Sequence, residues 1–311
     1  MAGNSMTKAG ELIQEFPALQ TVKKLAAEAK ARAGDAKATY QLPLWPENEV
    51  RAIPNHIARS SLFAPIGKKS GPRKRHNRAE IASRSDVSIR YSGPQLDMAD
   101  CDVFMQALQI AKAAPLGEKV YFLRSELLAA LKKSDAGAWY EWLHSSIERL
   151  TEGTLFIKTK RYVVGDPEDG DQEPSTEKPV RMRPRRSGLH LVAGFDFDED
   201  KQAYWLIFDP RVLAMFQNNE FALVDWEARL RIEKRVDMAK WLQNYVSTHE
   251  PGVHRISIEN LKKWCGYTSP LNKFKDALEA AMRELERVGI ISNAKIHANG
   301  TVSWARLRQS L

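Results

Sequence analysis

Cysteine is scarce in this chain of 311 residues, which contains Cys101 and Cys265 and no other. The two cysteines lie far apart, and neither has a cysteine or histidine neighbour at the spacing of metal ligands. A zinc site and a disulfide framework are therefore not expected. The scarcity of cysteine is typical of a protein from a reducing compartment.

Long apolar runs are also missing from the sequence. No stretch approaches the roughly 20 apolar residues that a membrane-spanning helix needs. The first residues, MAGNSMTKAGEL, lack the basic and then apolar pattern of a signal peptide. We therefore expect a cytoplasmic protein with no membrane partner.

Motifs that carry catalysis are absent as well. The sequence has neither a G-x-x-x-x-G-K-[ST] nor a G-x-G-x-x-G motif, so ATP hydrolysis and dinucleotide binding lack their phosphate cradle. The seven histidines are isolated, whereas a nicking enzyme needs histidines paired as metal ligands. The acidic cluster at 196–200 is interpreted as a polar turn between two strands. The sequence predicts a protein that is not an enzyme and uses no cofactor.

Positive charge is in moderate excess. Lys and Arg number 47 against 39 Asp and Glu, which gives a formal net charge of +8. This excess suits a polyanionic partner but is too small to prove one, and a soluble protein with a basic surface is the alternative. The length and the 43% hydrophobic content suffice for two ordinary domains and an arm.

Residues 1–85 are predicted to form a flexible arm. Residues 1–38 are rich in Ala, Lys and Glu and have little apolar surface to bury. Five prolines between 43 and 72 argue against long regular structure in the next part. A cationic run at 68–78 follows them, and we expect it to contact phosphates without choosing a sequence.

From about residue 86 the apolar residues become periodic, and residues 86–217 are predicted to form a first domain. The predicted helices are 103–114, 125–131 with Ser125 as N-cap, and 138–150 with Gly153 as its stop. A short strand is expected at 120–123. The predicted strands of a curled antiparallel sheet are 154–164, 187–197 and 202–209.

The same order recurs in residues 218–311, the predicted second domain. Its expected elements are a helix at 226–246, a strand at 254–258, a helix at 258–265 between Ser257 and Gly266, a helix at 270–288 between Ser269 and Gly289, and a hairpin with a two-residue turn at Asn299–Gly300. Helix, strand, helix, helix and hairpin is the winged-helix order. We therefore predict an α+β protein with two tandem winged-helix domains after the arm; an unrelated α+β chain that matches by chance is the alternative.

The last helix of a helix-turn-helix lies in the DNA major groove, with its N-terminal residues toward the bases. In the second domain we expect Ser269, Asn272, Lys273 and Lys275 to lie on this outward side. Asn can pair with adenine, and Lys can donate to guanine or to phosphate. The predicted core side is Leu271, Phe274, Leu278, Met282 and Leu285. A merely solvated helix face is the alternative.

The first domain gives a weaker signal for DNA, because its third helix has an outward face of mixed charge. Its basic residues lie in the following strand, at Lys158, Lys160 and Arg161. The loop at 165–187 is acidic first and basic last, and it either follows phosphates or only adds solubility. The first domain can therefore serve dimerisation as well as DNA binding.

Two stretches resemble the TrfA family of plasmid replication initiators. The first is QLPLW at 41–45, followed by RAIPN at 51–55 and ARSSLF at 58–63. The second comprises STHEP at 247–251, WCG at 264–266 and Glu284-Leu285. The likeness covers about residues 38–311, and the RAIPN and ARSSLF block is its more specific half because winged helices in general lack it.

The resemblance implies a protein that binds direct repeats (iterons) at a plasmid origin, helps to melt an adjacent AT-rich region and recruits host proteins, with DnaA and the replicative helicase among the implied partners. Such initiators are similar to the RepE and RepA class, in which paired winged helices and a monomer–dimer equilibrium are usual. A transcriptional repressor built on the same domains is the competing function. An enzyme such as a relaxase or primase would need active-site residues that we do not find.

The pentapeptide at 41–45 resembles the contact that the family makes with the host's sliding clamp. The resemblance assigns this role to Gln41, Leu42, Leu44 and Trp45, although Pro43 replaces a frequent Ser and Trp45 replaces Phe. A short extended peptide can place a glutamine in one subsite and an apolar pair in a pocket, and prolines lower its ordering cost. The alternative is that these side chains pack onto the protein's own first domain.

Overall fold

The computed structural model describes residues 49–66, 73–83, 87–112, 117–159, 163–164, 188–233 and 236–308. The chain divides into Met1–Tyr40 and Gln41–Leu311, and every described residue lies in the second of these parts. Among the described residues, no helix has the length and the apolar character needed to cross a membrane.

The first repeat comprises a helix, a strand, two helices and a hairpin. Its elements are α4 (Met98–Ala111), β6 (Lys119–Leu123), α5 (Arg124–Ala130), α6 (Gly137–Glu152), β10 (Val192–Asp198) and β11 (Ala203–Phe208). Helix α4 begins earlier than predicted because the Asp97 side chain accepts the backbone N–H groups of Ala99 and Asp100. Ser125 does not cap α5, since that helix starts after Leu123, whose N–H is accepted by Glu126.

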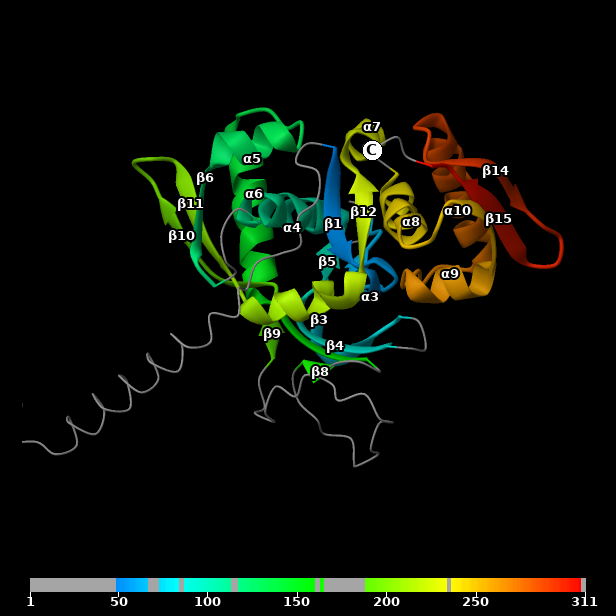
Figure 1. The fold of residues 1–311 in the computed structure, drawn as a ribbon, viewed down its shortest axis with the longest axis horizontal. Helices are drawn as coiled ribbons and strands as arrows, with labels where there is room; N and C mark the ends of the chain where they lie inside the picture. Colours follow the sequence, from blue (N-terminus) through cyan, green and yellow to red (C-terminus); the bar gives the residue numbers. More distant parts are fainter. Residues whose placement is uncertain are drawn as a thin grey trace, which may run out of the picture. The chain divides into compact units, whose positions relative to one another are not determined.

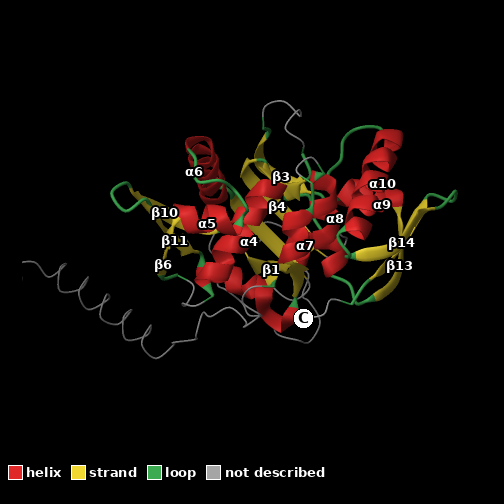
Figure 2. Cartoon of the chain, turned by 90° about the horizontal axis from the view of Figure 1, so that it is seen from above, coloured by secondary structure: helices red, strands yellow, loops and turns green. Residues whose placement is uncertain are grey.

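The second repeat has the same order of elements. They are α8 (Asp237–Ser247), β13 (Gly252–Ser257), α9 (Ile258–Trp264), α10 (Leu271–Arg287), β14 (Ile291–Ile296) and β15 (Thr301–Arg306). In both repeats the last strand lies between the other two, as β10-β11-β6 and β14-β15-β13. The two sheets lie at opposite ends of the described part, with the strands β1 and β12 between them (Figures 1 and 2).

Three details of the second repeat differ from the prediction. The expected helix 226–246 is two helices, α7 (Trp226–Arg231) and α8, because Ile232 is extended and buried. Pro270, not Ser269, stands at the N-cap of α10, and its side chain makes no cap hydrogen bond. The hairpin at Asn299–Gly300 is present, but its loop runs from His297 to Gly300 and is longer than two residues.

The prediction that residues 154–164 pair with the other strands of the first repeat is wrong, because these residues belong to a separate sheet. This sheet comprises β3 (Arg75–Ile81), β4 (Val87–Pro94), β7 (Thr154–Thr159) and β8 (Val163–Val164), with β9 (Leu189–His190) on β7. Strand β7 pairs with β4 from Val87↔Thr159 to Ser92↔Thr154. The three predicted strands are therefore divided between two sheets, because a hairpin from the N-terminal region supplies the partner for β7.

The prediction of a flexible arm to residue 85 is wrong for residues 50–64 and 75–81. Strand β1 (Val50–Pro54) pairs with β12 (Phe221–Asp225), which follows the 3-10 helix η1 (Pro210–Asn219). Helix α3 (Asn55–Ala58) comes next, and β2 (Phe63–Ala64) pairs with β5 (Leu96–Asp97). Every residue of β1 is buried. The apolar side chains of β1, together with Phe63, are therefore part of the core.

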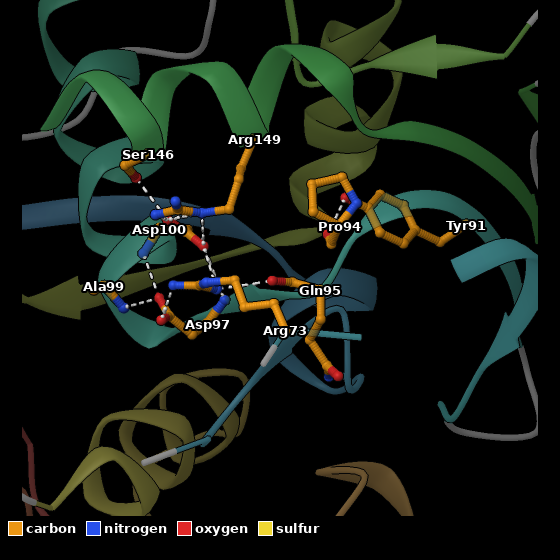
Figure 3. A network of polar contacts seen from close by, with 9 residues as sticks. All are labelled: Arg73, Tyr91, Pro94, Gln95, Asp97, Ala99, Asp100, Ser146 and Arg149. Carbon is orange, nitrogen blue, oxygen red and sulfur yellow. Dashed lines mark hydrogen bonds and ion pairs between the residues drawn. The ribbon is translucent and has the colours of Figure 1, made fainter. Parts of the chain in front are cut away.

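A polar network fixes the start of β3 to the first repeat (Figure 3). The buried Asp100 carboxylate accepts hydrogen bonds from Ser146 Oγ at 2.7 Å, Arg149 Nη2 at 2.7 Å and Arg73 Nη1 at 3.2 Å. Arg73 also pairs with Asp97 at 2.5 Å, and Arg75 pairs with Glu152. The cationic run at 68–78 is therefore not wholly a free arm, because two of its arginines are held in ion pairs.

A second buried network joins the two repeats. The fully buried guanidinium of Arg229 on α7 donates to Asp102 Oδ1 of α4 at 2.8 Å and to the backbone oxygen of Lys240 on α8 at 2.5 Å. The Lys240 ammonium pairs with the other oxygen of the Asp102 carboxylate. A buried charge is tolerated only when it is paired and hydrogen-bonded, so this network fixes how α4, α7 and α8 meet.

Candidate nucleic-acid interface

The turn between α9 and α10 is held by the N-terminal segment. Gly266 has φ +70°, as expected for a residue that ends a helix, and a Cβ at this position would lie 2.7 Å from Ser61 Cβ. The Tyr267 hydroxyl donates to the Lys273 backbone oxygen at 3.5 Å, and its ring lies 5.2 Å from that of Phe274. The entry of the chain into α10 is therefore fixed on two sides.

The first turn of α10 presents the residues predicted to contact DNA. Asn272 and Lys273 are exposed, as is Ser269 just before the helix, and Lys275 is partly exposed. Neither lysine has an ion pair within the described part of the chain, and the first turn contains no acidic residue. The positive end of the helix dipole adds to this charge. The structure thus brings these four residues together on one helix end.

The core side of α10 is confirmed with one exception. Phe274, Leu278, Met282 and Leu285 are buried, but Leu271 is 37% exposed, so its assignment to the core is wrong. Leu271 is the first residue of the helix. The apolar spacing alone does not show that this turn extends beyond the core.

The sheet of the second repeat adds two cations that sequence reasoning missed. Arg255 on β13 and Lys295 on β14 are both paired across the sheet with Ser303 of β15, so all three side chains lie on one face. Arg255 and Lys295 are exposed, and neither has an ion pair within the described residues. Ile258 N donates to Gly300 O at 3.0 Å, which holds the hairpin loop against the start of α9. The alternation of polar residues along the strands was the available signal.

The corresponding helix of the first repeat presents different chemistry. Arg124 lies 3.3 Å from the centre of the Tyr140 ring, and Lys133 lies 4.3 Å from that of Trp139. Both cations are thus already engaged with aromatic rings. Glu141 and Glu148 are exposed on the helix. The acidic cluster at 196–200 lies partly in the turn between β10 and β11, so its prediction as a polar turn is confirmed for 199–200.

Lys158 is not brought together with the α10 residues. It is exposed on β7, opposite Ser88 of β4, in a sheet separate from that of the second repeat. Lys160 and Arg161 lie outside the described residues, as do the loop 165–187 and the predicted clamp-binding residues Gln41, Leu42, Leu44 and Trp45.

The structure gives a physical account of two arginines in the RAIPN and ARSSLF block. Arg51 Nε donates to Gln106 Oε1 at 2.7 Å, its guanidinium lies 4.9 Å from the centre of the Trp226 ring, and burial lowers its pKa to about 10. Arg59 donates to Thr248 Oγ1 at 2.7 Å and to Thr248 O at 2.6 Å, at the end of α8. Both arginines therefore fix the N-terminal segment to the two repeats.

Cys101 and Cys265 are free and buried, and burial raises the pKa of each thiol to about 12. Neither thiol is thus a thiolate at neutral pH. Within the described residues, no three His, Cys, Asp or Glu side chains gather in a way that could hold a metal ion.

The family model described as TrfA protein matches residues 7–168, which is more than half of the chain. A plasmid replication initiator protein TrfA from Escherichia coli is 26% identical over 261 residues, which cover 83% of this chain and 62% of that protein. A crystal structure of domains 2 and 3 of RctB is similar with a TM-score of 0.53 and 14% identity, over 83% of this chain and 99% of that one. The last likeness concerns the fold alone.

Proposed function

This chain belongs to the TrfA family, and from that membership we propose that it initiates replication of a plasmid by binding repeated sequences (iterons) in duplex origin DNA. The two repeats serve as winged-helix domains, and the second one reads bases with the first turn of α10. The relative from Escherichia coli bears the name of a plasmid replication initiator, and this chain spans 62% of its length. Origin opening and recruitment of host proteins such as DnaA and the replicative helicase belong to the same proposal.

The observation that carries DNA binding is the composition of the first turn of α10. Asn272 and Lys273 are exposed at the positive end of a 17-residue helix, next to a turn that packing holds in place. An asparagine and a lysine on a rigid helix end are suited to the edges of bases and to phosphates. That the chain acts without catalysis of its own stays a prediction.

Footprinting on origin DNA with Asn272→Ala and Lys273→Ala tests the proposal. Each substitution should weaken repeat binding by about 1–3 kcal/mol if its side chain reads a base. Lys132→Ala, at an exposed lysine of the first repeat, is the matched control and should leave binding unchanged. Footprints that both α10 variants leave intact would show that α10 does not read the repeat. A plasmid that carries the repeats should replicate with the wild-type gene, whereas a repressor would bind them without supporting replication.

We further propose that Gln41, Leu42, Leu44 and Trp45 bind the host's sliding clamp. A peptide of residues 40–46 should bind the clamp with micromolar affinity, about −8 kcal/mol. Leu44→Ala and Trp45→Ala should remove most of this binding, since a buried side chain of leucine size contributes about 1.5–3 kcal/mol. Gln41→Ala should weaken it because its polar partners stay unpaired. Clamp binding that is undetectable while Trp45→Ala lowers the Tm of the whole protein would assign the segment to packing.

A further inference from the structure

The outer face of β3, β4 and β7 carries a set of polar and basic side chains that lies apart from α10. Ser88↔Lys158, Arg90↔Phe156 and Ser92↔Thr154 are opposite each other across β4 and β7, so they lie on one face. The alternate residues Ile89, Tyr91 and Leu155 are buried on the other face. Three neighbouring strands each carry a cation: Arg78 on β3, Arg90 on β4 and Lys158 on β7.

Arg78 is held over this face by an irregular backbone. Its φ is +46°, a conformation that residues with a side chain rarely adopt, at a bulge between His76 and Ala79. Its backbone N–H donates to Ser92 Oγ at 2.8 Å, and its guanidinium lies 5.2 Å from the centre of the Phe156 ring. Bulges re-aim side chains at functional positions, and here the bulge directs an arginine onto the face.

The positive charges of Arg90 and Lys158 are weakly compensated within the described residues. Arg90 and Lys158 have no ion pair within the described part of the chain. Among the described residues of β3, β4 and β7 on this face, the acidic one is Glu80, which lies opposite Arg90 and is exposed. The hydroxyls of Ser88, Ser92 and Thr154 occupy the positions between the cations. Guanidinium, ammonium and hydroxyl groups are the donors that bind phosphate oxygens.

We propose that this face binds phosphates of the DNA backbone beside the duplex that α10 reads, without choosing a sequence. The inference rests on the proposed function, which supplies the DNA. Strands about 4.8 Å apart spread the three cations over roughly 10 Å, a length over which one DNA strand presents about three phosphates. The major groove admits a two-stranded ribbon but not the face of a wider sheet. Arg78 covers the Phe156 ring, so base stacking, the usual mode for single strands, is disfavoured.

The test measures how the affinity of the full-length protein for a repeat duplex depends on salt, with Arg90→Gln/Lys158→Gln compared to the wild type. Each lost phosphate contact makes the slope of log K against log salt shallower by about 0.9, so the double variant should lose about 1.8. Its preference for the repeat over a scrambled duplex should stay the same. Lys132→Gln/Lys201→Gln, at exposed lysines away from this face, should keep the wild-type slope.

An unchanged slope in the Arg90 and Lys158 variant overturns the inference, and so does a change in which sequence it prefers. A larger loss on a single-stranded oligonucleotide than on the duplex would also overturn it. The proposed function fails separately, if the wild-type protein does not prefer the repeat. Arg78→Gly provides an independent check, because glycine adopts positive φ freely. We expect this variant to keep the wild-type Tm and to bind DNA with a shallower salt dependence; a lower Tm with an unchanged slope would assign Arg78 to folding alone.

Discussion

The two repeats share an order of elements and a strand arrangement, but the first turns of their third helices present different side chains. On α10 the first turn presents Asn272 and Lys273 and contains no acidic residue. The first turn of α6, which begins at Gly137, contains no acidic residue either, but it carries no charged side chain; Tyr140 lies against Arg124, and the exposed Glu141 follows it. A shared scaffold therefore does not give a shared function, because the surface residues determine what each helix end can bind.

The largest expected effect tests whether the two repeats fold as one unit. Arg229→Met removes the guanidinium that joins Asp102 of the first repeat to α8 of the second. Breaking a buried ion pair from one side should lower the free energy of unfolding by about 3–5 kcal/mol. Urea unfolding followed in both repeats should show one transition at lower urea. Lys201→Met, in an exposed pair with Asp198, is the control. Separate transitions, or a loss near zero, would show that the repeats are independent.

A smaller effect on stability distinguishes the turn of the second repeat from an ordinary helix end. Gly266 and Gly289 both have positive φ, but a Cβ added at Gly266 would meet Ser61, whereas a Cβ added at Gly289 would have no described atom within 4 Å. Alanine at either position should cost about 1–2 kcal/mol from backbone strain, and Gly266→Ala should cost more because of the contact. Thermal unfolding measures both. If the contact with Ser61 matters, Ser61→Gly should restore part of the stability that Gly266→Ala loses. Equal losses at the two glycines would show instead that Ser61 moves aside without cost.

Reversing charge on α6 should make the first repeat more similar to the second. Glu141→Lys/Glu148→Lys adds cations to a helix face that now carries exposed acids. We expect several-fold tighter binding to nonspecific duplex and a salt slope steeper by about 1–2 if the new lysines reach phosphates. Glu227→Lys on α7 gives the same kind of charge change elsewhere and is the control. Fluorescence anisotropy over a salt series that shows no difference between these variants would mean that α6 faces away from DNA.

The smallest effect is the change with pH in the stability that two carboxylates, Asp102 and Asp97, contribute; the two changes have opposite signs. Burial alone would raise the pKa of Asp102, but Arg229 and Lys240 outweigh it and hold this pKa below its usual value. Burial and the neighbouring Asp100 raise the pKa of Asp97. The charge of Asp102 therefore stabilises the fold above its unfolded pKa of about 3.9, and this stability is lost as the pH falls through the lower folded pKa.

Asp97 has the opposite sign, since its contribution is present below about pH 3.9 and is lost as the pH rises through its higher folded pKa. We therefore expect the stability difference between wild type and Asp102→Asn to shrink as the pH falls from 7 to 3. Over the same range, the free energy of unfolding of the wild type minus that of Asp97→Asn should rise, because the wild type gains stability as Asp97 is protonated. Urea unfolding at several pH values measures both, and parallel curves would show that neither carboxylate changes its pKa on folding.

Local signals in the sequence predict the two repeats because each is built from neighbouring segments. Apolar spacing places α6, α9 and α10 within a few residues of their ends, and Gly266 and Gly289 stop their helices as expected. Proline spacing misleads for β1, because Pro54 is the last residue of a strand whose partner, β12, lies far along the chain. Strand pairing between distant segments leaves no periodic mark in either one.

In the candidate DNA interface too, some residues are predictable from local signals and others are brought together only by pairing between distant segments. Asn272 and Lys273 are predictable because they lie beside the residues that mark the core side of one helix. Arg90 is not, since it comes near Lys158 only through the pairing of β4 with β7. Arg78 belongs to the cationic run 68–78 that is predicted to contact phosphates, but its position on this sheet depends on the pairing of β3 with β4. The interpretation of 68–78 as a uniform cationic run also conceals that Arg73 and Arg75 are held by carboxylates.

The pairing of β1 with β12 has a consequence for synthesis on the ribosome. Strand β1 emerges early, but its partner Phe221–Asp225 is translated only after the whole first repeat. Until then β1 has an unpaired edge and apolar side chains, a combination that favours pairing with other chains. A nascent chain that pauses before residue 225 should therefore need a chaperone, and a shortened product that starts after Pro54 would lack a central strand even though both repeats were complete.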